Sequence, residues 1–202
     1  MQYFIPKSAV VFEEEIKKSR FITYLQHTQG LSQAKAFWEQ VRALHPQARH
    51  HCWAAVAEQP TNSQALGFSD DGEPAGTAGK PMLNALLGSG IGEISAVVVR
   101  YYGGILLGTG GLVRAYGNGV QKALALLETH LKIERQFYAL VCDYAQVKDI
   151  LTLCERHDVV VESQDFQEKV RFVLGVSGDT LAPFTQDLTE RSAGQLRLML
   201  IE

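Results

Sequence analysis

The chain has 202 residues, 46% of them hydrophobic and 20% charged, which is typical of a globular protein with a packed core. A net charge of −3 argues against a general polyanion binder. No apolar run approaches the roughly 20 residues that span a bilayer, and the amino terminus does not resemble a signal peptide. Three well-separated cysteines, Cys52, Cys142 and Cys154, do not indicate a disulfide framework. We therefore expect a cytoplasmic protein with no membrane partner.

The first part of the chain mixes strands and helices. Apolar periodicity and turn residues predict strands over 10–16 and 20–26 as a hairpin, a helix over 32–44 capped by Ser32, strands over 52–57 and 65–68, a helix over 81–88, a strand over 95–102 and a helix over 112–128. The strand over 95–102 is the most apolar and is expected at the centre of a sheet. The residues predicted to be buried in the two longer helices are Ala36, Phe37, Val41, Leu44, Val113, Val120, Leu124 and Leu127.

The rest of the chain has a different order of elements. It predicts a strand over 137–143, a helix over 146–157, strands over 159–165 and 170–176, a helix over 179–192 and a closing strand over 195–201. This βαββαβ order is the split-βαβ, or ferredoxin-like, arrangement. The expected fold class is α+β, with an N-terminal domain of residues 1–132 and a C-terminal domain of residues 133–202.

An acidic turn, Asp70-Asp-Gly-Glu-Pro74, is the first candidate site. Its carboxylates could hold a divalent cation, and Asp71 and Glu73 are candidates for an acid and a base. The spacing fails the calcium-loop pattern, and no metal is expected. The favoured interpretation is a tight turn whose carboxylates cap backbone N–H groups or pair with Arg100 or Arg114.

Gly79-Lys80 superficially suggests a phosphate loop. That motif requires glycine at position 74 and serine or threonine at position 81, and both positions are proline. Lys80 remains a candidate anion contact at the start of a helix.

The second candidate site is the glycine-rich segment from Arg100 to Tyr116. Seven glycines between residues 103 and 119 exceed what one turn requires. Glycines and free N–H groups at a helix start admit an anion, arginines bind it, and tyrosines can stack on bases. The predicted anion or nucleic-acid surface comprises Lys80, Arg100, Tyr101, Tyr102, Gly103, Gly104, Gly108, Gly110, Gly111, Arg114 and Tyr116. Alternatively, the glycines allow a sharp turn and close helix–sheet packing.

Two nearby patterns predict no site. A dinucleotide fingerprint would need glycine at position 113, which is valine. His50-His51-Cys52 has no second ligand pair, so neither a zinc site nor a cysteine nucleophile is supported, and Cys52 is interpreted as a packed thiol. Lys17-Lys18 is interpreted mainly as a solvated hairpin tip, with a contact to phosphate as the alternative.

Four segments of the chain resemble the IMPACT family, in particular its bacterial YigZ-like members. They are Ser19-Arg-Phe21, His51-Cys-Trp-Ala54, Asp70-Asp-Gly-Glu-Pro-Ala-Gly-Thr-Ala-Gly79 and Arg100-Tyr-Tyr-Gly-Gly-Ile-Leu-Leu-Gly-Thr-Gly-Gly-Leu-Val-Arg-Ala-Tyr116. The resemblance covers most of residues 15–128. It implies an N-terminal domain like the second domain of ribosomal small-subunit protein five and a C-terminal domain like the last domain of elongation factor G. It also implies a link to translation, because the eukaryotic relatives are translation regulators that act through protein partners.

Three functions remain open at this level. The first is a translation-linked regulatory protein that binds RNA, DNA or the ribosome through its N-terminal domain. That part of the chain has a net charge of +1 through His130, whereas the remainder has −4. The alternatives are an enzyme acting on a phosphorylated or carboxylated small molecule, and a module that binds a translation-related protein. We assign no reaction and expect no cofactor.

Overall fold

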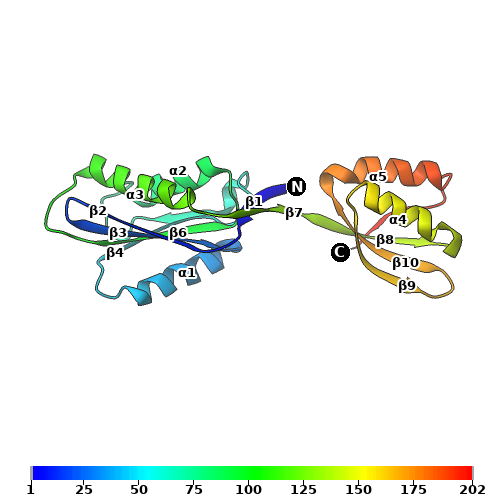
Figure 1. The fold of residues 1–202 in the computed structure, drawn as a ribbon, viewed down its shortest axis with the longest axis horizontal. Coiled ribbons are helices and arrows are strands. Elements are labelled where there is room, and N and C mark those ends of the chain that lie inside the picture. The colour runs from blue at the N-terminus through cyan, green and yellow to red at the C-terminus, as the bar shows by residue number, and fades with distance from the viewer. Residues whose placement is uncertain (1, 202) are drawn as a thin grey trace. The chain divides into compact units, whose positions relative to one another are not determined.

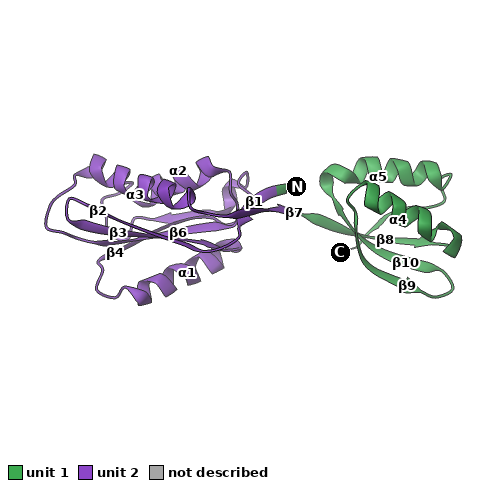
Figure 2. Cartoon of the chain, viewed as in Figure 1, with its two compact units in different colours: residues 1–2, 133–202 green, residues 3–132 purple. Residues whose placement is uncertain are grey.

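A computed structural model of the chain describes residues 2–201. It contains two compact units (Figure 2). The first unit is Tyr3–Lys132, and the second runs from Ile133 to the end of the described chain and includes Gln2. Both units combine helices with antiparallel sheets, so the α+β class is confirmed. Within residues 2–201, no helix is long and apolar enough to cross a membrane.

A five-stranded antiparallel sheet forms the framework of the first unit (Figure 1). Its strands, in spatial order, are β2 (Val10–Ile16), β3 (Ser19–His27), β6 (Ile94–Tyr101), β4 (His50–Val56) and β5 (Leu66–Ser69). The predicted hairpin is β2–β3, and the most apolar strand is central, as expected. Helices cover both faces of β6, so its continuous apolar run is buried between them.

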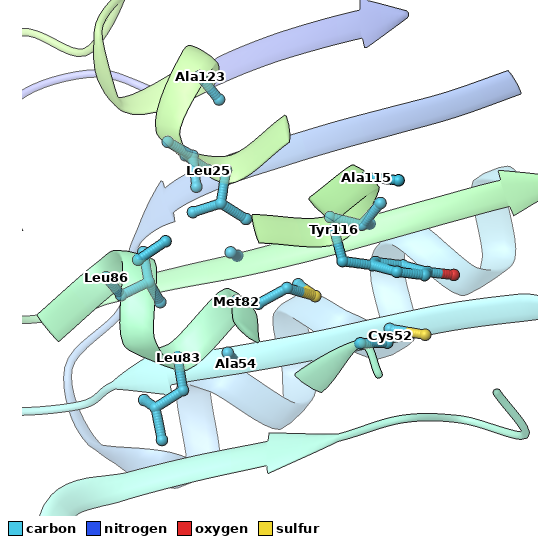
Figure 3. Packing of buried hydrophobic residues seen from close by; sticks show 14 of the residues in the cluster. Leu25, Cys52, Ala54, Met82, Leu83, Leu86, Ala115, Tyr116 and Ala123 are labelled. Atoms are coloured by element: carbon cyan, nitrogen blue, oxygen red, sulfur yellow. The ribbon is translucent and has the colours of Figure 1, made fainter. Parts of the chain in front are cut away.

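Three helices pack on this sheet. Helix α1 (Gly30–Leu44) lies on one face, and α2 (Gly79–Ser89) and α3 (Thr109–Leu124) lie on the other (Figure 1). Figure 3 shows Met82 and Leu86 of α2 and Tyr116 of α3 in one cluster with Leu25 of β3. This larger core therefore lies between the sheet and the α2–α3 pair.

Some residues predicted to be buried in helices are exposed. Helix α1 begins at Gly30, with Ser32 inside its first turn, and its buried face is Ala34, Phe37 and Val41. The predictions for Ala36 and Leu44 were therefore wrong. Helix α3 begins at Thr109, three residues earlier than predicted. Its buried stripe is Leu112, Ala115, Tyr116, Gly119, Val120 and Ala123, whereas Val113 is exposed.

The strands β1 (Gln2–Pro6) and β7 (Thr129–Ile133) form a separate two-stranded sheet that was not predicted. Buried Glu93 ties it to the first unit. Its carboxylate accepts a hydrogen bond from the Tyr3 hydroxyl at 2.9 Å, contacts His27 Nε2 at 2.7 Å and pairs with Lys132. Burial alone would raise the pKa of Glu93, but hydrogen bonds from Lys132, His27 and Tyr3 lower it.

The second unit has the predicted βαββαβ order. Its elements are β8 (Arg135–Cys142), α4 (Val147–Arg156), β9 (Val160–Phe166), β10 (Val170–Ser177), α5 (Gly178–Arg191) and β11 (Met199–Leu200). The strands are arranged β11-β8-β10-β9 in one antiparallel sheet, and both helices cover the same face (Figure 1). The closing strand is shorter than the predicted 195–201, and near its predicted start the Leu196 N–H bonds to the Ser192 hydroxyl and not to a strand.

Candidate functional site

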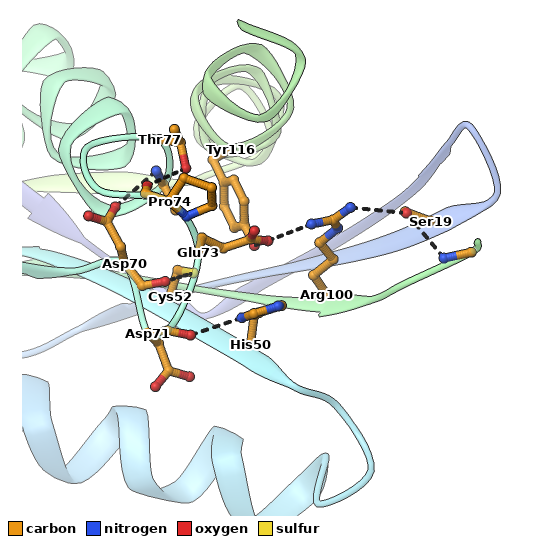
Figure 4. Close-up of polar contacts among 12 residues, drawn as sticks. Ser19, His50, Cys52, Asp70, Asp71, Glu73, Pro74, Thr77, Arg100 and Tyr116 are labelled. Carbon is orange, nitrogen blue, oxygen red and sulfur yellow. Dashed lines mark hydrogen bonds and ion pairs between the residues drawn. The ribbon is translucent and has the colours of Figure 1, made fainter. Parts of the chain in front are cut away.

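The acidic turn and the glycine-rich segment converge on one carboxylate (Figure 4). Oε1 of Glu73 accepts hydrogen bonds from Arg100 Nη1 and from the Tyr116 hydroxyl, each at 2.7 Å. The Glu73 and Arg100 side chains are only 4% and 7% exposed. Since β6 ends beneath α3, the inward-facing Arg100 is desolvated and needs this partner. The interpretation of the turn as a structural ion pair is therefore confirmed for Glu73.

Arg100 is enclosed on its remaining sides. Its guanidinium lies 5.5 Å from the ring centroids of both Phe21 and Tyr102. Nη2 is 3.5 Å from Ser19 Oγ, which also accepts the N–H of Gly103 at 3.2 Å. Within residues 2–201, Arg100 Nε has no hydrogen-bond partner. Arg100 therefore holds the interior together and does not present its charge to a ligand.

This burial corrects part of the predicted binding surface. Tyr116 is fully buried against Phe21, in an edge-to-face contact with 5.4 Å between centroids, so it cannot stack on a base. Tyr101 lies on the opposite face of the sheet, where its hydroxyl meets His45 Nδ1 at 2.9 Å. The sequence did not reveal these orientations because they depend on which helix covers each face.

Asp70 organises the start of α2. Its carboxylate accepts the N–H groups of Gly76, Ala78 and Gly79 at 2.8–3.0 Å. These groups would otherwise be unsatisfied at the helix start. Burial alone would raise the pKa of Asp70, but the three backbone donors together lower it.

Replacing Asp70 with asparagine is expected to lower the free energy of unfolding by about 1–2 kcal/mol near neutral pH, because a neutral amide is a weaker acceptor. The folded-state pKa of Asp70 lies below the ordinary value of 3.8, so the ionised form is the stabilising one. Its contribution is complete above that value and is lost as the pH falls through the folded-state pKa. Urea unfolding at several pH values would therefore show the wild-type and variant curves converging in acid.

The exposed Glu39→Gln provides the control for this pH series. Both tryptophans of the chain, Trp38 and Trp53, lie in the first unit, so their fluorescence follows this unit alone. A difference between Asp70→Asn and wild type that stays constant down to strongly acidic pH would contradict the assigned role of the carboxylate.

The other residues of the acidic turn also make structural contacts. Asp71 has a left-handed backbone, and its carboxylate accepts the His51 N–H at 2.7 Å while its carbonyl meets His50 Nδ1 at 2.9 Å. Gly72 follows in the left-handed region, and the carbonyl of Pro74 accepts the Thr77 hydroxyl. Glu73 is therefore held in an interior ion pair, whereas the Asp71 side chain is 30% exposed and lines a groove at the surface.

Cys52 lies beneath the same turn as a packed thiol, in agreement with the sequence. Its Sγ donates to the Asp70 carbonyl at 2.9 Å, and burial raises the pKa of the thiol well above its usual range. A thiol held protonated in this way is not a nucleophile at neutral pH. Across residues 2–201, no group of three or more His, Cys, Asp and Glu side chains is arranged to hold a metal ion.

The glycine loop packs against the turn between β2 and β3, a contact that the sequence did not reveal. A Cβ on Gly103 would overlap the Lys18 carbonyl group. Lys17 and Lys18 both have left-handed backbones, with φ of 47° and 63°. A signal was available, because a two-residue hairpin turn without glycine or asparagine is unusual.

Several predicted binding residues remain accessible. Tyr102 is 50% exposed, and Arg114 and Lys80 are exposed on α3 and α2. Gly104, Gly108 and Gly110 are exposed in the loop and the first turn of α3, with Gly111 partly exposed. Helix α3 begins without a side-chain cap at Gly108.

Two separate grooves border the motifs. One, of about 320 Å³, includes Arg114 and Gly111 from the glycine-rich segment. The other, of about 420 Å³, includes Asp71 and His51. The two motifs therefore meet in the interior, through Glu73 and Arg100, and face different grooves on the surface.

Comparisons with known proteins agree with this division of the chain. The Impact N-terminal domain matches residues 17–124, and a domain of unknown function (DUF1949) matches residues 140–195. An IMPACT family member of Haemophilus influenzae is 65% identical over 201 residues, covering 100% of this chain and 98% of that protein. The IMPACT family member YigZ of Escherichia coli is 56% identical over 200 residues, which cover 99% of this chain and 98% of that protein. A crystal structure of a hypothetical protein, 55% identical, has a TM-score of 0.70 and covers 100% of this chain and 98% of the other. The chain therefore belongs to the IMPACT family, as a two-domain α+β member.

Proposed function

We propose that this protein is a translation-linked regulator that binds RNA through its first unit. The observation that carries the proposal is a set of four exposed cations: Lys17 and Lys18 in the β2–β3 turn, Lys80 in the first turn of α2 and Arg114 in the second turn of α3. Lys17 and Arg114 line one groove. None of the four makes an ion pair with another residue in the described part of the chain. An unpaired cation can bind phosphate without breaking an ion pair in the protein, whereas a paired cation must first give up its partner.

Two further features favour a strand of nucleic acid as the ligand. The uncapped start of α3 directs backbone N–H groups outward, and such groups bind anions. Tyr102, at the start of the glycine loop, offers a half-exposed ring on which an unpaired base can stack. Of the RNA-binding surface predicted from the sequence, the proposal keeps Lys80, Tyr102 and Arg114. It adds Lys17 and Lys18. A likeness of the two units to domains of ribosomal small-subunit protein five and elongation factor G would fit the same process.

Replacing Arg114 with alanine is expected to weaken binding of a single-stranded RNA about tenfold, because one charge-assisted phosphate contact is lost. The slope of log affinity against log salt should also become shallower by roughly one unit. Fluorescence anisotropy with a labelled oligonucleotide, titrated at several salt concentrations, measures both quantities. A DNA competitor of the same sequence tests the preference for RNA.

Lys35→Ala provides the matched control, since Lys35 is exposed on α1 at the other face of the sheet. It removes the same charge away from the proposed surface and should leave affinity nearly unchanged. Equal affinities for Arg114→Ala and wild type, or no binding at low salt, would overturn the proposal.

A second candidate, a protein-binding tip, is favoured by one observation. Leu106 is 81% exposed and Ile105 is 41% exposed in the glycine loop, beside Tyr102. Exposed neighbouring apolar side chains often mark protein contacts. Loss of a protein partner in Leu106→Ser, with RNA affinity retained, would favour this candidate over RNA binding.

A further inference from the structure

The groove between β2 and α3 combines an apolar floor with a cationic rim. Ile16, Leu107 and Ala115 contribute the floor, and Lys17, Arg114 and Lys122 contribute the rim. The helix residues Gly111, Arg114, Ala115, Asn118 and Lys122 follow the spacing i, i+3, i+4, i+7 and i+11, which places them on one face of α3. The volume of about 320 Å³ lies at the lower end of the range for small-molecule sites.

The charges in this groove are unbalanced. Lys122 pairs with Glu14, the acidic residue of the lining. Within residues 2–201, Arg114 Nε donates to the Gly110 carbonyl at 3.3 Å, and neither Arg114 nor Lys17 makes an ion pair. Two positive charges, those of Lys17 and Arg114, therefore remain without an ion-pair partner at a groove that also offers apolar surface. The complementary ligand has one anionic end and one flat, weakly polar end.

Lys17 is also held in place by the fold. Left-handed backbone conformations cost roughly 1–2 kcal/mol for residues with a Cβ, and Lys17 and Lys18 both adopt one. Their turn is fixed because Lys18 packs against Gly103, which has no side chain to obstruct it, and because Ser19 Oγ accepts the Gly103 N–H. The glycine motif thus holds a lysine at the groove in a conformation that a free hairpin would disfavour.

We propose that this groove binds one nucleotide unit, with its phosphate between Lys17 and Arg114 and its base on the Ile16–Leu107–Ala115 floor. Asn118 lines the same groove and offers both a donor and an acceptor to a base edge. The proposal rests on the proposed function and makes it specific, since the groove would hold one residue of the RNA strand. A free nucleotide has the same chemistry, so the test distinguishes the two sources.

The test fills the groove without changing its charge. Asn118→Trp places a large ring in the groove, whereas Gln40→Trp places the same ring on the exposed side of α1, at the other face of the sheet. The full-length variants and wild type are compared by anisotropy with a labelled oligoadenylate and by NMR titration with AMP, adenosine and inorganic phosphate. Wild type should bind AMP about tenfold more tightly than adenosine or phosphate, because only AMP engages both ends of the groove. Asn118→Trp should lose AMP binding and bind the oligoadenylate about tenfold more weakly, whereas Gln40→Trp should match wild type.

Each outcome decides between the nucleotide site and the broader proposal. If Arg114→Ala weakens oligoadenylate binding but Asn118→Trp does not, the nucleotide site is overturned while RNA binding stands. Absence of RNA binding in wild type would sink the proposed function. AMP shifts that then still map to the groove would support the site for a free nucleotide, and their absence would overturn it. If Gln40→Trp folds but Asn118→Trp does not, Asn118→Leu takes its place, because leucine is smaller than tryptophan and still removes the amide. Asn118→Leu should weaken AMP binding severalfold, and unchanged AMP binding would also overturn the site.

Discussion

Replacing Glu73 with alanine is expected to lower the free energy of unfolding of the first unit by about 3–5 kcal/mol. The substitution leaves the Arg100 guanidinium buried without its carboxylate and removes the acceptor of the Tyr116 hydroxyl. Breaking a buried pair costs more than the pair contributes, because the remaining charge stays desolvated. Urea unfolding followed by tryptophan fluorescence measures the loss, and Glu39→Ala on the exposed face of α1 should change stability little.

A double-mutant cycle built from Glu73→Leu, Arg100→Met and the double variant separates the ion pair from simple loss of packing. Arg100→Met alone should also destabilise the unit, since Glu73 would then be the unpaired charge. Combined with Glu73→Leu, it should recover much of the loss, because an apolar pair of similar volume leaves no buried charge. Losses that add fully in the double variant would rule out the assigned coupling. If Glu73→Leu alone does not fold, Glu73→Gln takes its place in both the single and the double variant, because its amide oxygen still accepts a hydrogen bond from Tyr116.

Replacing Gly103 with alanine is expected to be the second most damaging change, at about 3 kcal/mol. The added Cβ would overlap the backbone carbonyl of Lys18, which cannot rotate away as a flexible side chain can. The loop and the β2–β3 turn would have to separate, and the Ser19 bond to the Gly103 N–H would weaken. Chemical denaturation with tryptophan fluorescence again reports the loss.

Gly104→Ala is the matched control for this steric effect. Gly104 has φ of +86°, but no atom lies within 4 Å of the place that a Cβ would take. Alanine there should lower the free energy of unfolding by about 1 kcal/mol, the strain of a left-handed backbone alone. Equal losses for the two variants would show that close packing against Lys18 does not explain the glycine at position 103.

Local pattern was sufficient for most of the secondary structure. The alternation of Val10–Ile16 predicted one strand of a hairpin, and the apolar run that became β6 predicted a central strand.

Helix starts were less predictable. At α3 the first turn consists of Thr109, Gly110 and Gly111, and glycine disfavours a helix, so the sequence placed the start at Leu112. The two short strands β1 and β7 were missed because 122 residues separate the end of one from the start of the other, from Pro6 to Thr129, and neither alternates strongly.

The candidate site was found from sequence only as a region. Composition and motif spacing pointed to the acidic turn and the glycine-rich segment, because both depart from what ordinary turns require. The roles of individual residues needed the fold. Alternation along β6 puts Arg100 and Tyr101 on opposite faces, but only the packing of α3 over one face makes Arg100 an interior ion-pair partner of Glu73. Likewise, only the approach of the β2–β3 turn to Gly103 brings Lys17 to the groove beside Arg114. Periodicity is a local property that short sequences carry, whereas burial and convergence of charges depend on contacts between segments far apart in the chain.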